Sequence, residues 1–437
     1  MESQTESNNN NNGVGEGNNE IQALVPRLRR EPGHDRSGRP EAGVAHSLKF
    51  GLALTLVSVF YYVTPRFNSW GDSTIWAVIT VLFVMEFTVG ATLSKGINRV
   101  LATLTAGLLA VGVHLVARLC GEAGEPAVLA VFVFVDENSS AATFSRFIPE
   151  VKARCEYGVI IFLLTFVMVT VSSYRVENLI EYAHERVTTI MVGVATCLFT
   201  TVFVFPIWAG EDLQKLAAGN LDKLAEFLEG MESDCFGENS CDKLEGRAFL
   251  QVYKSVLNSK ATEDTLCTFA KWEPAHGKFR FHHPWSQYQK IGALCRQCAS
   301  SMEALASYVV ASKKSQYPEA NPELSMKVGA ACRAISLQSS KALRELSSAV
   351  RTMTIPSPTD DDDDNMPTAI RTASDFITEL SDDDAVVLQV MHVAVIASFF
   401  ADIAAQTERI SEAVDDLARL ARFEKTDRAV VVNIENL

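Results

Sequence analysis

The sequence lacks the short motifs that mark most enzyme active sites. None of the patterns GxSxG, GxGxxG, HExxH and the P-loop occurs with the strand, turn or helix context that its chemistry requires. A basic segment followed by an apolar core is also missing at the start of the chain, so we expect no cleavable secretory signal. We therefore expect a protein that is not an enzyme, with no catalytic residues, no cofactor and no nucleic-acid partner.

A metal site also has little support in the sequence. The nine cysteines are an odd number scattered over the chain, which indicates reduced thiols and not a disulfide framework. Cys295 and Cys298 form one CxxC pair with His282 and His283 nearby, but a second ligand pair at regular spacing is missing. Because structural zinc needs four ligands in a tetrahedron, we predict ordinary helix packing for this pair and no bound metal.

Apolar runs dominate residues 46 to 208, where short charged connections separate them. Several runs have only about 16 residues without a charge, slightly fewer than the roughly 20 that cross a bilayer core. Their clustering nevertheless favours membrane spans, because connections this short leave little helix surface that faces water. The six predicted spans are Leu48 to Val63, Thr74 to Gly90, Ile97 to Ala117, Pro126 to about Ala142, Tyr157 to Ser172 and Val187 to Trp208.

Composition predicts an all-α protein: a six-span transmembrane helical domain followed by a cytosolic helical bundle. After residue 210, apolar residues recur at spacings of three and four, which is the period of an amphipathic helix. The start of the chain is polar and rich in asparagine, and we expect it to be disordered. The predicted parts are a disordered tail over residues 1–45, a transmembrane domain over 46–209 and a bundle over 210–437 with an acidic linker near 356–366.

One apolar run in the C-terminal part resembles a seventh span. This run, VVLQVMHVAVIASFFA, contains Gln389 and His392 and has charged residues close on both sides. These polar groups would be costly in lipid. We therefore predict a buried bundle helix.

Charge in the connections predicts the orientation of the spans. Lys and Arg are most frequent before the first span and after the second and fourth spans. By the positive-inside rule these segments face the cytosol, and an even number of spans then places both termini there. We expect a multi-pass protein of the plasma membrane rather than of the vacuolar membrane. The basic residues in these segments are Arg27, Arg29, Arg30, Arg36, Arg39, Lys49, Lys95, Arg99, Arg146, Lys152 and Arg154.

Four ionisable side chains lie within or beside the predicted spans, where charge is costly and indicates function. Glu86 interrupts the second span, Lys95 and Arg99 follow it, and Arg175 lies just after the fifth span. Lys95 and Arg99 are four residues apart and would share one face of a helix. Because rings of Lys and Arg select anions in pores, we predict an anion pathway through the three cations, with Glu86 as a partner or modulator.

Three other interpretations remain open. In the simplest interpretation, the long side chains of the cations extend to the lipid headgroups by snorkelling. In the second, the protein is a proton-coupled efflux carrier of organic or aromatic acids, with Glu86 or His114 as the proton relay. In the third, it is a membrane-anchored helical scaffold without transport, although a scaffold has no reason to place charges at the ends of spans.

The segment from Trp272 to Trp285 combines aromatic and basic residues. Phe279 and Phe281 alternate with basic residues, so an extended segment would bury one aromatic face and expose a basic one. One interpretation is an element that couples the bundle to the membrane domain, and the other is an aromatic loop that caps the bundle. We favour the aromatic cap.

Several long motifs resemble those of the aluminium-activated malate transporter family of plants. They are WAVITVLFVMEFTVGATLSKGINRVLATLTAG, SRFIPEVKARCEYGVIIFLLTF, SSYRVENLIEYAHERVTTI, FPIWAGEDL and KWEPAHGKFRFHHPW. The resemblance extends from about Lys49 to Phe423 and therefore includes both halves of the chain. It implies an anion channel for malate and often inorganic anions, embedded in lipid as a homodimer with six spans per subunit. It also implies that Lys95, Arg99 and Arg175 line the pore.

The predicted fourth span departs from the family pattern. Asp136, Glu137 and Asn138 interrupt it where relatives have an apolar run. Each carboxylate near the centre of a span costs on the order of 3 kcal/mol on insertion scales. Three alternatives are open for this span: it is broken, it faces a water-filled vestibule, or its acids are protonated. If Asp136 and Glu137 reach the pore, they are modulators that oppose anions and lower conductance.

Overall fold

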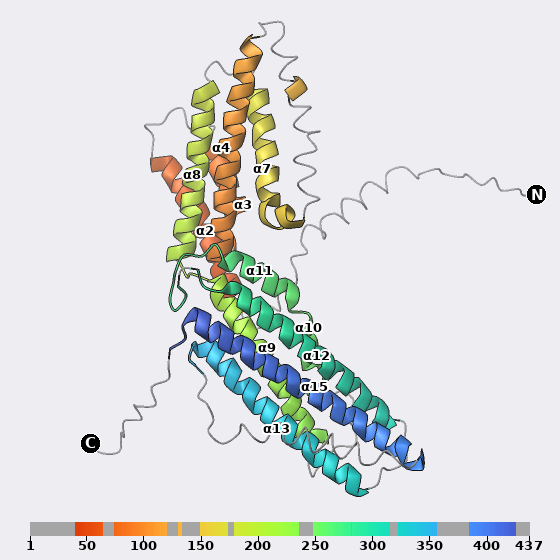
Figure 1. Ribbon diagram of the computed structural model, residues 1–437. Coiled ribbons are helices and arrows are strands. Elements are labelled where there is room, and N and C mark those ends of the chain that lie inside the picture. Colours follow the sequence, from red (N-terminus) through yellow and green to blue (C-terminus); the bar gives the residue numbers. More distant parts are fainter. Residues whose placement is uncertain are drawn as a thin grey trace, which may run out of the picture. The chain divides into compact units, whose positions relative to one another are not determined.

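The computed structural model describes residues 40–63, 74–119, 130–132, 149–173, 179–235, 248–280, 282–314, 322–355 and 384–424 (Figure 1). The chain divides into two compact units, Met1–Ala45 and His46–Leu437, and every contact reported below lies within the second. Every named element in the described ranges is a helix, and the strand-like pairings there are two isolated bridges. The predicted all-α class is confirmed.

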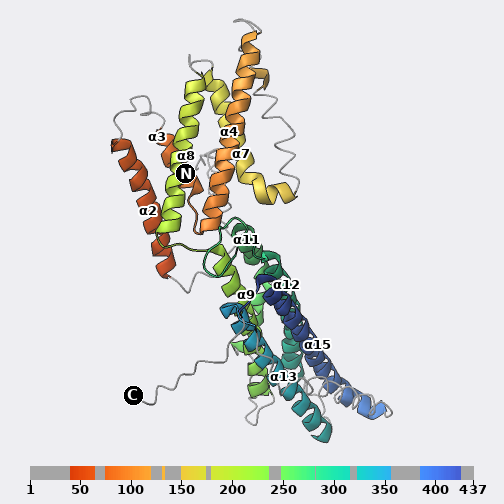
Figure 2. The same cartoon turned by 60° about the vertical axis from the view of Figure 1, so that its left-hand side comes forward.

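Within the described ranges, five long helices between residues 40 and 203 form what we call the membrane module. α4 is central to it, because it contacts α3, α7 and α8. α3 in turn contacts α8, and the two views in Figures 1 and 2 show α4 and α7 side by side. The bounds are α2 Pro40–Val63, α3 Thr74–Val84, α4 Val89–Leu119, α7 Pro149–Ser173 and α8 Leu179–Phe203.

These five helices correspond to the first, second, third, fifth and sixth predicted spans. Within the described ranges, three segments are long and apolar enough to cross a membrane, and two shorter helices are also apolar. The predicted fourth span lies outside these ranges except for residues 130–132. The three long segments are Gly43–Phe60, Val89–Leu119 and Ala183–Phe203, and the shorter ones are Ile75–Val84 and Tyr157–Thr170.

The break between α3 and α4 differs from the sequence prediction. It lies at residues 85–88, so the span expected from Thr74 to Gly90 is wrong at its C-terminal end. Thr88 caps α4, because its hydroxyl accepts a hydrogen bond from the N–H of Ala91 at 3.3 Å. The two cations of the segment GATLSKGINR therefore lie inside a membrane helix and not in a connection.

Two apolar clusters hold the membrane module together. In one, Ala106, Ala110 and Ala117 of α4 form a stripe against Phe166 and Val169 of α7. Small side chains at helical spacing let the two backbones approach closely. The other cluster joins α2, α3 and α8 and contains Ala53, Val57, Ala77, Val81, Val84, Met85, Ile190, Val194 and Cys197.

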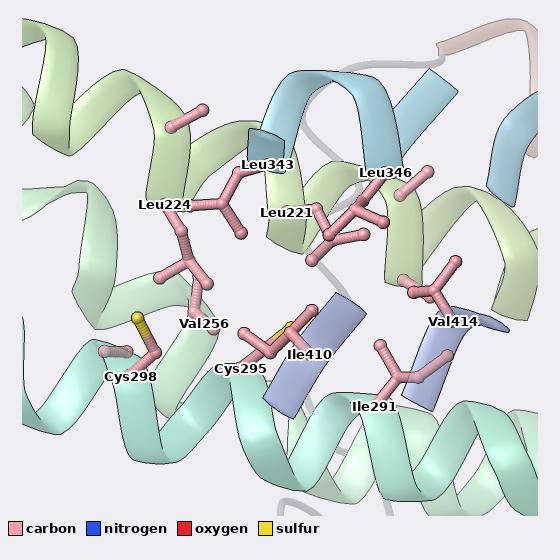
Figure 3. Packing of buried hydrophobic residues seen from close by; sticks show 14 of the residues in the cluster. Leu221, Leu224, Val256, Ile291, Cys295, Cys298, Leu343, Leu346, Ile410 and Val414 are labelled. Carbon is pink, nitrogen blue, oxygen red and sulfur yellow. The ribbon is translucent and has the colours of Figure 1, made fainter. Parts of the chain in front are cut away.

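Among the residues that the structure describes from 209 onward, six helices form the C-terminal bundle. α9 contacts α10, α11, α12 and α13, while α15 contacts α12 and α13. Figure 3 shows leucines of α9 and α13 packed over Ile291 and Cys295 of α12 and over Ile410 and Val414 of α15. The bounds are α9 Ala209–Cys235, α10 Phe249–Leu257, α11 Lys260–Ala270, α12 Trp285–Lys314, α13 Pro322–Thr352 and α15 Asp384–Ala421.

The apolar run that resembled a seventh span lies in α15. Ala397, Phe400 and Ile403 are buried in the core of the C-terminal bundle. The prediction of a buried bundle helix is therefore confirmed. The predicted tail before residue 40 and the acidic linker at 356–366 lie outside the described ranges.

Candidate functional site

The first part of α4 places two of the predicted cations on one helix. Lys95 forms an ion pair with Glu86, which lies in the break before α4. Both side chains are partly exposed, at 33% for Lys95 and 25% for Glu86. The sequence suggested Glu86 as a partner of the three cations without choosing among them, and the structure pairs it with Lys95, so that Glu86 offsets part of the lysine's charge.

Arg99 is buried one turn further along α4. Its exposed fraction is 3%, and its Nη1 donates a hydrogen bond to the hydroxyl of Tyr157 on α7 at 3.3 Å. The Nε of this guanidinium has no acceptor among the described residues. A buried cation with an unused donor is costly, and this group could bind an anion.

Tyr157 was missed by the sequence analysis as a member of this site. Its ring centroid lies 5.8 Å from the Nζ of Lys95, and its hydroxyl accepts from Arg99. An aromatic face attracts a nearby ammonium through the quadrupole of the ring. The sequence signal was a tyrosine at the end of a predicted span, which by itself does not distinguish an interfacial anchor from a site residue.

Lys49 is a second residue whose role the sequence did not reveal. It counted there only as a basic residue before the first span, yet its side chain is fully buried. In α2 it shares a stripe with Ala53 and Val57, which face α3 and α8. Within the described part of the chain its Nζ has no hydrogen-bond partner. The i, i+4, i+8 spacing with two apolar residues was the available signal.

Arg186 on α8 is also buried in the membrane module, but aromatic and sulfur groups surround it. Its guanidinium carbon lies 3.7 Å from the ring centroid of Trp76, and its Nη2 lies 2.6 Å from the sulfur of Met168. A guanidinium stacked on tryptophan is the favourable cation–π geometry. Arg186 therefore packs as part of the helix interface.

Three predicted site residues lie outside the described ranges. They are Arg175, Asp136 and Glu137, the first after α7 and the other two in the predicted fourth span. Their placement in an anion pathway stays a prediction.

The CxxC pair lies in the apolar core of the bundle. Cys295 and Cys298 are fully buried, and burial raises the pKa of Cys298 to about 12. Within the described ranges, no group of three or more His, Cys, Asp or Glu side chains could hold a metal ion. The prediction of ordinary helix packing for the two cysteines is confirmed.

The segment from Trp272 to Trp285 combines both interpretations that the sequence left open. Phe279 and Trp285 are buried in the bundle core, as expected for an aromatic cap. Glu273, however, accepts a hydrogen bond from the backbone N–H of Gly90 in α4. The favoured interpretation was therefore incomplete, because the same segment also contacts the membrane module.

Comparison with known proteins finds a family model and several relatives whose names all refer to the same family. Residues 39–382 match the model of a family described as aluminium activated malate transporter. Aluminum-activated malate transporter 1 of Triticum aestivum is 62% identical over 399 residues, which cover 90% of this chain and 86% of that protein. Aluminum-activated malate transporter 7 of Arabidopsis thaliana is 41% identical over 410 residues, covering 87% and 80%. Aluminum-activated malate transporter 2 of Arabidopsis thaliana is 43% identical over 384 residues, covering 87% and 75%.

Proposed function

The chain belongs to the aluminium-activated malate transporter family, and we propose that it is a channel through which malate and inorganic anions cross a plant membrane passively. The family name and the names of the relatives describe transporters and not enzymes. This agrees with the absence of enzyme motifs in the sequence.

The single observation that best supports this proposal is the environment of Arg99. A guanidinium that is 3% exposed within a membrane module is costly unless an anion compensates its charge. Tyr157 accepts one hydrogen bond from it, and Nε–H has no acceptor among the described residues. A carboxylate of malate suits such a group, because it can accept two parallel bonds from guanidinium.

Lys95 and Lys49 would add positive potential beside Arg99. Lys95 acts as a point charge that its ion pair with Glu86 weakens. Lys49 contributes a buried ammonium without a partner in the described ranges. Arg175 is proposed as a further cation of the pathway. Binding must remain weak enough for release, and partial neutralisation by Glu86 serves that need.

We propose a homodimer with both termini of each subunit in the cytosol, in the plasma membrane. A two-fold axis would supply each cation twice and complete a ring around the anion. α4 exposes a row of large apolar side chains that would face lipid or the second subunit. These are Leu101, Leu104, Leu108 and Leu115.

Voltage clamp of the expressed protein tests the function directly. We expect currents that reverse at the anion equilibrium potential when malate, nitrate, chloride and sulfate are varied on opposite sides. A proton-coupled carrier would instead follow the proton gradient. Glu86 and His114 do not pass a proton directly to one another, because α4 extends about 28 Å between Lys95, the partner of Glu86, and His114.

The substitution Arg99→Gln tests the proposed site. Loss of one charge-assisted contact predicts a fall in malate current of about tenfold at equal surface expression. Arg118→Gln is the matched control, since Arg118 is an exposed arginine in the last turn of the same helix. Equal malate currents and equal anion selectivity in the two variants would contradict the assignment of Arg99.

A further inference from the structure

We propose that Glu273 is a positioning residue that couples the C-terminal bundle to the pore cations on α4, because its carboxylate caps the N-termini of two helices at once. Its effect on current rests on the proposed channel function, whereas its effect on helix ends does not. Glu273 lies in the loop between α11 and α12, far in sequence from both helices that it caps.

The geometry of this carboxylate is specific. Its Oε1 accepts hydrogen bonds from the N–H of Ala209 at 2.6 Å and from the N–H of Gly90 at 3.3 Å. Its Oε2 accepts from the N–H of Gly210 at 3.0 Å. Ala209 and Gly210 are the first residues of α9, and Gly90 is the second residue of α4. The Glu273 side chain is only 1% exposed, so water does not compete for these bonds.

The chemistry of helix N-termini explains why a carboxylate is favourable at this position. The first N–H groups of an α-helix have no acceptor within the helix, and the helix dipole makes that end positive. A carboxylate accepts hydrogen bonds from these N–H groups, and its negative charge interacts favourably with the positive end of the helix. Charge-assisted hydrogen bonds of this kind are among the stronger ones in proteins. Burial raises the pKa of Glu273, and the N–H groups of Gly210, Ala209 and Gly90 act against that rise. One side chain thus ties α4 to α9.

Close packing around the cap requires glycine at both helix ends. A Cβ on Gly90 would lie 2.3 Å from the carbonyl oxygen of Phe269 in α11. A Cβ on Gly210 would lie 2.4 Å from the ring of Trp285. Contacts this short force a displacement. The two helix starts are therefore held against the bundle by backbone contact as well as by the carboxylate.

Two further contacts reinforce the same junction. The N–H of Val89 in α4 donates to the carbonyl of Ile207, just before α9, at 2.9 Å. Trp208 stacks on His276, with ring centroids 3.8 Å apart, and His276 belongs to the loop that contains Glu273. The start of α4 is thus fixed to the segment before α9 and to the loop between α11 and α12.

The cap lies close to the proposed anion site along a continuous helix. Lys95 follows Gly90 by five residues and Arg99 by nine, which at the rise of an α-helix is about 7 and about 13 Å. Since α4 is unbroken over Val89–Leu119, a shift of its first turn moves both cations. A change of packing in the bundle can reach the anion pathway through Glu273 without any contact to the anion.

The first test measures amide hydrogen exchange in the full-length protein in detergent. Glu273→Ala should speed exchange at the start of α4 and of α9 by about tenfold, because both lose their acceptor. Exchange in the middle of α13 should not change. Glu273→Asp keeps the charge on a shorter side chain. Its exchange rates at the two helix starts should lie between those of the unmodified protein and those of Glu273→Ala. Unchanged exchange at both helix starts in Glu273→Ala would overturn the proposal, even if no current could be measured.

The second test compares two glycines of the same helix by voltage clamp. Gly90→Ala should change the malate-to-chloride permeability ratio by threefold or more at equal surface expression. Gly107→Ala should leave that ratio unchanged, since a Cβ on Gly107 meets nothing within 4 Å.

A double variant tests whether the two changes act through the same coupling. If they do, Glu273→Gln combined with Gly90→Ala should change the permeability ratio no more than either substitution alone. Equal ratios in the two glycine variants would refute the coupling. Absence of current in the unmodified protein would refute the channel and leave the exchange test standing.

Discussion

The C-terminal bundle and the membrane module both bury charged side chains, but they satisfy these charges differently. In the bundle, Glu263 is 2% exposed and forms an ion pair with Arg296. Its Oε1 also accepts from the hydroxyl of Ser259 at 2.5 Å and from the amide of Asn220 at 3.2 Å. In the membrane module, Arg99 and Lys49 retain donors without an acceptor among the described residues.

This difference in hydrogen bonding indicates that the buried charges of the two regions have different roles. A buried network whose charges are paired, as Glu263 is with Arg296, favours one packing arrangement. A buried cation with an unused donor lowers stability and is retained only where another role requires it. Glu263 is therefore a structural residue of the bundle, and the unused donors of Arg99 and Lys49 agree with the proposal that they belong to the transport pathway. Substitutions in the two regions should consequently affect different measurements.

The largest effect on stability is expected in the bundle. Glu263→Ala leaves Arg296 without its carboxylate and should reduce the free energy of unfolding by about 3 kcal/mol. Thermal unfolding of the purified protein measures this. Asp264→Ala, at the exposed neighbouring position, is the control. If both variants melt at the same temperature as the unmodified protein, the network contributes nothing to stability.

The opposite pattern is expected for the buried lysine of the membrane module. Lys49→Met removes an unpaired buried charge and should leave the melting temperature unchanged or higher, because the desolvation cost disappears. The malate current should fall about fivefold. Lys254→Met removes an exposed lysine from α10 and should change neither quantity. A lower melting temperature with full current would show that Lys49 is structural.

A smaller change is expected at the ion pair of the membrane module. Glu86→Gln removes the carboxylate that offsets Lys95, so the local positive potential rises. Anion current should increase about twofold, with a larger effect on divalent malate than on chloride. Glu86→Asp should remain close to the unmodified protein. A decrease in current after Glu86→Gln would mean that the carboxylate is needed to hold Lys95 in place.

The smallest expected effect is on the pH dependence of the melting temperature, and it comes from His283 in the aromatic core of the bundle. Burial, with His276 nearby, lowers the pKa of His283 from 6.5 to about 4. The unfolded chain therefore binds a proton on this residue as pH falls from 6.5 towards 4, while the folded chain does not, and stability decreases over that window. His283→Gln should remove this part of the pH dependence of the melting temperature. His184→Gln, at an exposed position, should retain it. Equal pH profiles for all three proteins would exclude a contribution from His283.

Local pattern predicted the elements of this protein well and their junctions poorly. The helical period of the C-terminal part and the apolar runs correctly predicted α9, α13 and five helices of the membrane module. The end of α3 was placed too late, because Met85, Phe87 and Val89 continue the apolar run of α3 beyond the single charge of Glu86. Thr88 begins α4 there as its N-cap, and hydropathy does not detect a polar contact of this kind. Glu86 could be recognised from the sequence as a partner of the nearby cations, but the structure was needed to show that it pairs with Lys95.

The order of residues was sufficient to establish an all-α membrane protein with a C-terminal bundle and with two cations at the junction of the second and third predicted spans, whereas the structure placed these cations inside α4. These features follow from periodicity and transfer energies, which are properties of short segments. Packing alone decided that Lys49 is buried, that Tyr157 contacts both Lys95 and Arg99, and that Glu273 caps helices that begin more than sixty residues before it. Such contacts depend on which surfaces meet in space, and no local pattern records that.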